Sequence, residues 1–219
     1  HQLSHASAYY HSGFTDAAVI VLDTVGELAT TSVWLGNGRQ LKRRWSQSYP
    51  QSVGLFYSAM VDRCGLVAGQ DELAFMGLAG QGDYRKYYNQ IKQDLIEWRR
   101  YPCPKIQLRY NLHRGCRWWR ADITDVENIA AAVQKIYEEI LFDIALYARG
   151  ISNTKNLVIV GDTARLASAN AILARRELFE NIYIPPSPGD AGASLGSILA
   201  HSRRHIELKN NLLGYPIEG

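Results

Sequence analysis

The chain has 219 residues, of which 47% are hydrophobic and 21% are charged, a composition that supports one folded domain with a sizeable core. Its net charge of +3 is too small to favour a nucleic-acid partner. The sequence holds no apolar run of about 20 residues and no leader of the secretory type, so we expect a cytoplasmic protein without a membrane partner. Its three cysteines form no CxxC pair, which argues against a disulfide framework and against a zinc knuckle.

The chain opens on two histidines, His1 and His5, in a stretch of helix-compatible residues. On a helix, side chains four residues apart lie on one face, close enough to hold one metal ion. A second pair at the same spacing, His201 and His205, encloses two arginines whose positive charge disfavours a cation. We therefore interpret the second pair as a surface helix face.

A three-strand meander is predicted next. The apolar, largely β-branched run 17–22 is typical of a buried central strand, and Asp23 places a carboxylate at its C-terminal end. The stretches 28–35 and 39–48 are the second and third predicted strands, joined by a Gly-Asn-Gly hairpin signal at 36–38.

The middle of the chain has helical character. Hydrophobic periodicity predicts helices over 52–64, 71–79, 83–98 and 124–149. Residues from about 100 to 122 show no clear period and mix arginines with tryptophans. We interpret this segment as an irregular insert, a lid or packing element, and as the candidate region for contacts with a variable substrate.

Two strand–helix units complete the pattern. A buried strand at 156–160 runs through Gly161 into a helix over 163–175, a geometry that lets backbone N–H groups meet a phosphate or a nucleoside. A strand at 181–184 leads through a proline-rich loop to a helix for which Asp190 is the expected N-cap. For each unit alone, an ordinary strand–helix connection is a sufficient explanation.

Two glycines, Gly192 and Gly196, leave one face of that last helix bare, so that backbone or ligand can approach it closely. The whole order, a three-strand meander followed by βαβα, resembles a ribonuclease-H-like module, an α/β layered fold. In that arrangement Asp23, Gly161 and Asp190 all fall at strand ends, where open α/β sheets bind ligands.

Several separate motifs then coincide in order along nearly the whole chain, and together they resemble the carbamoyltransferase family of nodulation and antibiotic biosynthesis. They are His-x-x-x-His-Ala at 1–6, Tyr-x-Ser-Gly-Phe at 10–14, Val-Leu-Asp at 21–23, Gly-Glu at 26–27, Thr-Thr-Ser at 30–32, Asp-Glu at 71–72, Met-Gly-Leu-Ala at 76–79 and Pro-x-x-Gly-Asp-Ala-Gly-Ala-x-Leu-Gly at 186–196. The resemblance implies that 1–219 is a single lobe, the second half of an actin/hexokinase-type, Kae1-like domain.

The resemblance also implies a chemistry. In that family carbamoyl phosphate gives carbamate, ATP converts carbamate to carbamoyl-adenylate, and the Kae1-like domain moves the carbamoyl group to a hydroxyl of a sugar or another small acceptor. A metal ion, usually iron, is held by two histidines and two aspartates, and the matching positions here are His1, His5, Asp23 and Asp190. Imidazole with carboxylate suits Fe(II), Zn or Mn.

The family's nucleotide-binding turn and helix match Gly161 and Asn170, and the resemblance makes Gly161, Asp162, Asn170 and Gly189 the candidate nucleotide-binding residues. The chain departs from the family in this region, because Asp162 stands where the family has a second glycine and adds negative charge beside the phosphates. A lysine that the family places after the Asp-Glu pair is replaced by Ala74. These departures affect ATP handling more than metal binding.

The resemblance places the general base for the acceptor hydroxyl upstream of His1, so no catalytic residue is assigned within the chain. It also places a YrdC-like domain, which makes the adenylate, downstream of the lobe, and we do not expect this chain to turn over alone. Two other functions stay open. One is a threonylcarbamoyl-tRNA-type transferase, which the modest charge disfavours. The other is a binding module of the same fold that has lost ATP use.

Overall fold

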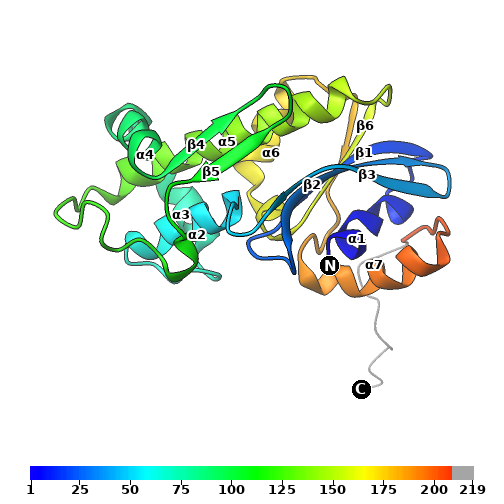
Figure 1. Ribbon diagram of the computed structural model, residues 1–219, viewed down its shortest axis with the longest axis horizontal. Helices are drawn as coiled ribbons and strands as arrows, with labels where there is room; N and C mark the ends of the chain where they lie inside the picture. The colour runs from blue at the N-terminus through cyan, green and yellow to red at the C-terminus, as the bar shows by residue number, and fades with distance from the viewer. Residues whose placement is uncertain (209–219) are drawn as a thin grey trace, which may run out of the picture.

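A computed structural model describes residues 1–208, and the end of the predicted lobe, 209–219, lies outside the described residues. At its centre is a five-stranded mixed sheet with the order β3-β2-β1-β6-β7 (Figure 1). The strands are β1 (Asp16–Leu22), β2 (Ala29–Asn37), β3 (Gln40–Ser48), β6 (Asn156–Val160) and β7 (Asn181–Tyr183). The first three pair antiparallel as the predicted meander, and β6 and β7 run parallel to β1. The result is a mixed α/β fold, consistent with an actin-like lobe.

The strand β1 is central because both of its faces are apolar. Its residues 17–22 are all buried, and their side chains alternate between two hydrophobic clusters. Val19 and Val21 belong to one cluster, whereas Ile20 and Leu22 belong to the other. A strand buried on both faces has a continuous apolar sequence, which is why this element was predictable.

Helices cover both faces of the sheet and make three layers (Figure 1). One face carries α1 (Gln2–Ala6), the 3-10 turn η1 (Ser7–His11) and α7 (Asp190–Ser202). The other carries α2 (Val53–Arg63), the long helix α5 (Val126–Gly150) and α6 (Ala167–Arg175). Among residues 1–208, no helix is long and apolar enough to cross a membrane.

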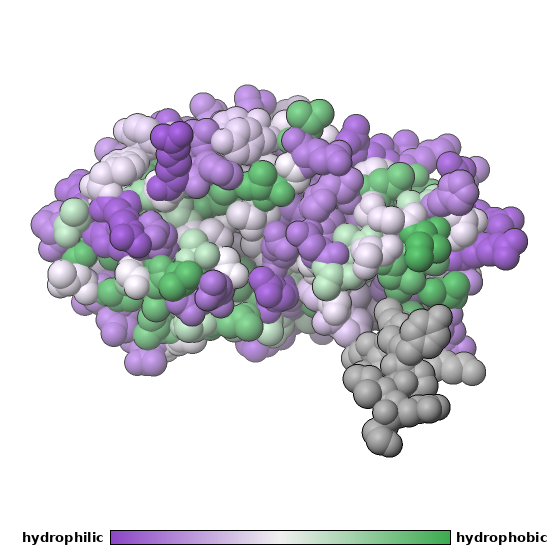
Figure 2. All heavy atoms as spheres, turned by 90° about the horizontal axis from the view of Figure 1, so that it is seen from below, coloured by the Kyte–Doolittle hydropathy of each residue, from purple (hydrophilic) through white to green (hydrophobic). Residues whose placement is uncertain are grey.

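The remaining elements pack along the length of α5 and beside α2 (Figure 1). They are α3 (Glu72–Ala79), η2 (Tyr84–Lys86), α4 (Tyr88–Asp94), β4 (Ile96–Arg99), β5 (Lys105–Leu108) and η3 (Leu112–Arg114). The strands β4 and β5 form a separate antiparallel pair. Figure 2 views the molecule from below, and the described residues on that face show hydrophobic patches separated by hydrophilic surface rather than one apolar belt.

The predicted helix over 83–98 is wrong at its C-terminal end, and the insert at about 100–122 is not wholly irregular. The helix α4 stops at Asp94, and β4 pairs with β5 so that Trp98 lies opposite Ile106. Ile96 is buried and Glu97 is exposed, an alternation with the period of a strand that four residues are too few to reveal against a helical background.

Two smaller predictions near the C-terminal end also need correction. The helix predicted over 163–175 opens with a 3-10 turn, η4 (Asp162–Arg165), before α6 begins. The helix α7 ends at Ser202, and Arg203 adopts a left-handed backbone conformation, so His205 does not lie on a helix face. The imidazole Nε2 of His205 lies 2.8 Å from the carbonyl oxygen of Gly38 instead.

The bare face predicted for α7 is confirmed, and backbone covers it. A Cβ atom at Gly196 would lie 1.9 Å from the carbonyl oxygen of Ser4, and one at Gly192 would lie 2.0 Å from the carbonyl oxygen of Ser187. Glycine at 196 therefore sets how closely α7 packs against α1.

We predict that Gly196→Ala lowers the free energy of unfolding by about 1–3 kcal/mol, because the added methyl group must push the two helix backbones apart. Gly77→Ala is the matched control, since Gly77 is exposed within α3 and a Cβ atom there meets nothing within 4 Å. The control is expected to raise the free energy of unfolding by up to about 1 kcal/mol, because alanine has a higher helix propensity than glycine. Urea denaturation checks both variants, and equal effects at the two glycines would contradict the packing argument.

Candidate metal centre

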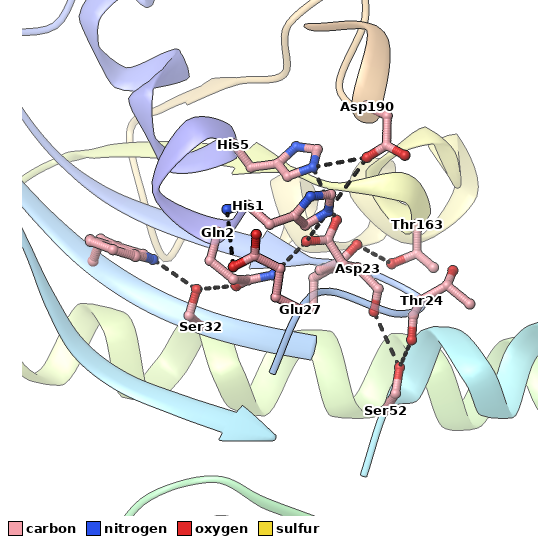
Figure 3. Close-up of polar contacts among 12 residues, drawn as sticks. His1, Gln2, His5, Asp23, Thr24, Glu27, Ser32, Ser52, Thr163 and Asp190 are labelled. Carbon is pink, nitrogen blue, oxygen red and sulfur yellow. Dashed lines mark hydrogen bonds and ion pairs between the residues drawn. The ribbon is translucent and has the colours of Figure 1, made fainter. Parts of the chain in front are cut away.

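Four polar side chains meet where β1 ends, beneath the contact of α1 with α7 (Figure 3). His1 is the N-cap residue of α1, and His5 lies one turn later on the same helix. Asp23 directly follows β1, where its backbone N–H donates to the carbonyl oxygen of Thr30 at 2.8 Å. The predicted N-cap role of Asp190 is wrong, because Gly189 is the N-cap residue of α7 and Asp190 is the first residue of the helix, where its side chain makes no capping hydrogen bond. Three segments far apart in the chain thus supply the four side chains.

The two imidazoles face both carboxylates at close range. His1 Nε2 lies 3.5 Å from Asp23 Oδ2 and 3.5 Å from Asp190 Oδ1. His5 Nε2 lies 3.5 Å from Asp23 Oδ1 and 3.3 Å from Asp190 Oδ1. Atoms of His1, His5 and Asp190 all lie within 4.8 Å of one another, and Asp23 joins them through both of its oxygens.

Burial divides the four side chains into an inner and an outer pair. The side chains of His5 and Asp23 are 1% and 0% exposed, whereas those of His1 and Asp190 are 27% and 73% exposed. The centre is therefore closed on the side of the sheet and open on the side of Asp190, so a ligand can reach it from solvent.

Two buried side-chain atoms of the centre lack hydrogen bonds within the described residues. They are His5 Nε2 and Asp23 Oδ1, which face each other across 3.5 Å without hydrogen-bond geometry. An unsatisfied buried polar atom lowers the stability of the fold by about 1–3 kcal/mol, so two such atoms side by side indicate that a bound group normally contacts them. Two imidazole nitrogens with carboxylate oxygens make a donor set that suits Fe(II), Zn or Mn. The residues fit the ion that the sequence predicted, and their role as ligands stays a prediction.

The electrostatics of the centre also favour a cation. Burial raises the pKa of Asp23 to about 6, His5 opposes that rise, and the carboxylates of Asp162 and Asp190 add to it. Three acidic groups thus share a small region in which one is fully buried. A bound cation would offset this repulsion.

Sequence reasoning missed one member of the centre. The side-chain amide of Gln2 donates to Asp23 Oδ2, and Gln2 is itself buried. A glutamine between two candidate ligands carries neither a motif nor a periodicity, so no sequence signal pointed to it.

The predicted nucleotide turn lies next to the candidate metal centre. Gly161 has a φ of 102°, and a Cβ atom there would lie 2.3 Å from the carbonyl oxygen of Leu22, so only glycine fits this turn. Its N–H donates to the carbonyl oxygen of Pro188 at 2.7 Å, which ties the turn to the loop before α7. A Cβ atom at Gly189 would lie 3.0 Å from Asp162 Oδ1, so the Asp162 carboxylate sits against the start of α7.

Asn170, the fourth predicted nucleotide residue, is buried within α6. Its Nδ2 donates to the carbonyl oxygen of Ala164 at 2.7 Å and so holds the turn η4 in place. Its Oδ1 has no hydrogen-bond partner within the described residues. The geometry thus gives Asn170 a supporting contact to the turn, and any contact with a nucleotide stays a prediction.

A cleft of about 400 Å³ opens beside the centre, between the end of β1, α2, α3 and η4. Its polar lining includes Thr24, Ser58, Glu72, His113, Asp162 and Arg165. Of these, His113 comes from the insert, which therefore reaches the cleft. Glu72 is oriented by two donors, the N–H of Gly69 at 2.6 Å and the hydroxyl of Ser58 at 2.9 Å, and both end on its Oε1.

Comparison with known proteins assigns the chain to a family. The sequence model of the carbamoyltransferase N-terminus matches residues 1–199. The chain is 31% identical to an uncharacterized protein of Synechocystis sp., over 94% of this chain and 36% of that protein. It is 28% identical to nodulation protein NolNO of Sinorhizobium fredii, over 92% of this chain and 30% of that protein.

A third relative, nodulation protein NolO of Bradyrhizobium diazoefficiens, is 27% identical over 91% of this chain and 37% of its own length. The chain thus spans about a third of the length of the curated relatives it matches. The match along 1–199, together with the motifs that converge at the end of β1, shows that this chain belongs to the carbamoyltransferase family and matches its N-terminal region.

Proposed function

We propose that this chain is the metal- and nucleotide-binding lobe of an O-carbamoyltransferase that depends on ATP and carbamoyl phosphate. The lobe would transfer the carbamoyl group from carbamoyl-adenylate to a hydroxyl of a small, sugar-like acceptor. The observation that carries the proposal is the meeting of two imidazoles and two carboxylates at the end of β1, where buried His5 Nε2 and Asp23 Oδ1 lack partners. Membership of the carbamoyltransferase family supports it.

His1, His5, Asp23 and Asp190 would hold the ion. When bound, such an ion supplies a Lewis acid that polarises a phosphate or carbonyl oxygen. The inner pair, His5 and Asp23, would fix the position of the ion, because both side chains are fully enclosed. The outer pair, His1 and Asp190, would border the open side from which substrate enters.

The cleft beside the centre would hold the adenylate. It borders both Thr24, next to the ligand Asp23, and Asp162 on the nucleotide turn, so one small molecule can touch both. The two donors to Glu72 both end on Oε1, which leaves Oε2 to accept a hydrogen bond from a ribose or sugar hydroxyl. In the overall reaction the acceptor oxygen forms a bond to the carbamoyl carbon, AMP leaves, and the acceptor proton is released to a base.

We predict that the intact protein binds about one transition-metal ion per chain. His5→Ala is expected to weaken metal binding by more than about 100-fold, because loss of a ligand should cost more than loss of a hydrogen-bond partner of a ligand, which costs about 10–100-fold. His201→Ala is the matched control, because His201 is an exposed histidine on α7. Metal analysis of freshly purified protein and titration against a chromophoric chelator measure both. An intact protein that contains no ion and takes up none would refute the metal centre.

We predict that Asp162→Asn tightens ATP binding about fivefold, because like charges at a solvated site repel by about 1 kcal/mol. Isothermal titration calorimetry measures the change, with Asp122→Asn, an exposed carboxylate of the insert, as the control. A protein that gives no heat with ATP or with carbamoyl phosphate, before and after the substitution, would instead support the binding module that has lost ATP use.

We predict that the intact protein converts ATP to AMP and pyrophosphate only when carbamoyl phosphate is present, and that it labels a hydroxylated acceptor from labelled carbamoyl phosphate. Asp190→Asn is expected to abolish labelling, because it removes a charged candidate ligand on the substrate side. Chromatography of the nucleotide products and mass spectrometry of the acceptor are the measurements. Labelling of tRNA in the presence of threonine and bicarbonate would favour the threonylcarbamoyl transferase.

A further inference from the structure

A chain of buried hydrogen bonds runs from β2 to the metal centre (Figure 3). The indole N–H of Trp34 donates to Ser32 Oγ at 2.7 Å, and the Ser32 hydroxyl donates to Gln2 Oε1 at 2.5 Å. The amide Nε2 of Gln2 then donates to Asp23 Oδ2. All four residues are buried, and their exposed fractions range from 0% to 8%.

The two ends of this chain fix its direction. The ionised carboxylate of Asp23 can only accept, so it draws the NH₂ group of Gln2 and leaves the carbonyl oxygen of Gln2 facing Ser32. The indole nitrogen of Trp34 can only donate, so Ser32 Oγ accepts from it and gives its own hydrogen to Gln2. A donor at one end and an acceptor at the other thus hold the glutamine amide in one orientation.

The consequence appears at the two oxygens of Asp23. Oδ2 accepts the hydrogen bond from Gln2, whereas Oδ1 is left without one and faces His5 Nε2. The backbone at this point is held separately, because the hydroxyl of Ser52 donates to the carbonyl oxygens of Asp23 at 3.2 Å and Thr24 at 2.8 Å. Gln2 supplies the side-chain hydrogen bond that limits rotation of the Asp23 carboxylate.

We propose that Gln2 is a positioning residue for the metal centre: oriented by Ser32 and Trp34, it occupies Oδ2 of Asp23 and presents Oδ1 to the ion shared with His5. This inference rests on the proposed function, since it assumes that the four side chains bind an ion. Outer partners of metal ligands contribute about 10–100-fold in metal affinity, which is the size of effect expected here.

The test is metal affinity in the intact protein, stripped of metal and titrated with Zn(II) against a chromophoric chelator. Gln2→Met keeps the length of the side chain and removes both hydrogen bonds, so we expect binding weaker by about 10–100-fold. Gln2→Glu keeps an acceptor for Ser32 but sets a carboxylate oxygen against Asp23 Oδ2, and we expect at least an equal loss. The visible absorption of the Co(II)-loaded protein is expected to change in both variants, because the geometry at Asp23 changes.

Gln134→Met is the matched control. Gln134 is also a buried glutamine with two hydrogen bonds, one from the hydroxyl of Tyr57 at 2.9 Å and one to Glu138 at 2.9 Å, but it lies on α5 beyond the opposite face of the sheet. We expect this variant to lose thermal stability while its Zn(II) affinity and Co(II) spectrum stay those of the unaltered protein.

Trp34→Phe covers the case in which a Gln2 variant does not fold. It removes only the indole donor, so we expect a smaller loss of Zn(II) affinity in the same direction. If the Gln2 and Trp34 variants lose stability as Gln134→Met does, but keep the Zn(II) affinity and the Co(II) spectrum, Gln2 is merely structural and the inference fails alone. If the unaltered protein binds neither ion, the metal centre and the inference fail together.

Discussion

The close packing of α1 on α7 is the constraint on which the candidate centre depends. The carbonyl oxygen of Ser4 occupies the space that a side chain at Gly196 would need, so the two helix backbones touch directly. The histidines lie on α1 and Asp190 begins α7, and this contact therefore decides whether imidazole and carboxylate meet. The strand β1 supplies the third part, because its buried course ends with Asp23 under the same contact.

Within the centre, the inner side chains are buried and held in place, whereas the outer side chains are open to solvent. His5 and Asp23 are enclosed by sheet and helix, and Asp23 is held on its far side by Gln2 and at its backbone by the strands around it. Asp190 is open to solvent, next to a turn that Gly161 keeps narrow. An enclosed inner half limits rearrangement of these side chains, and an open outer half leaves room for a small molecule. The proposed function, to fix an ion and still admit a substrate, needs both properties.

The fold was predictable where one residue period dominates. The continuous apolar run of β1 and the long apolar face of α5 were both identified, since each repeats one pattern over many residues. The segment 83–108 was not, because a short helix, a turn and two four-residue strands follow one another too quickly for either period to establish itself. The strands β4 and β5 are stabilised by pairing with each other and packing on α5, and neither interaction leaves a local mark in the sequence.

The sequence by itself, through the resemblance of its motifs to a family, predicted which residues would gather as candidates for a metal and a nucleotide, because imidazole and carboxylate groups are suitable metal ligands and glycine allows a tight turn. It also determined that His1 and His5 share a helix face, since that follows from helix geometry alone. Only the tertiary structure decided that Asp23 and Asp190 meet this face, that Gln2 joins them, and that Asn170 turns inward to hold η4. Those contacts join residues far apart along the chain, and their distances are set by how helices pack on a sheet rather than by any local preference.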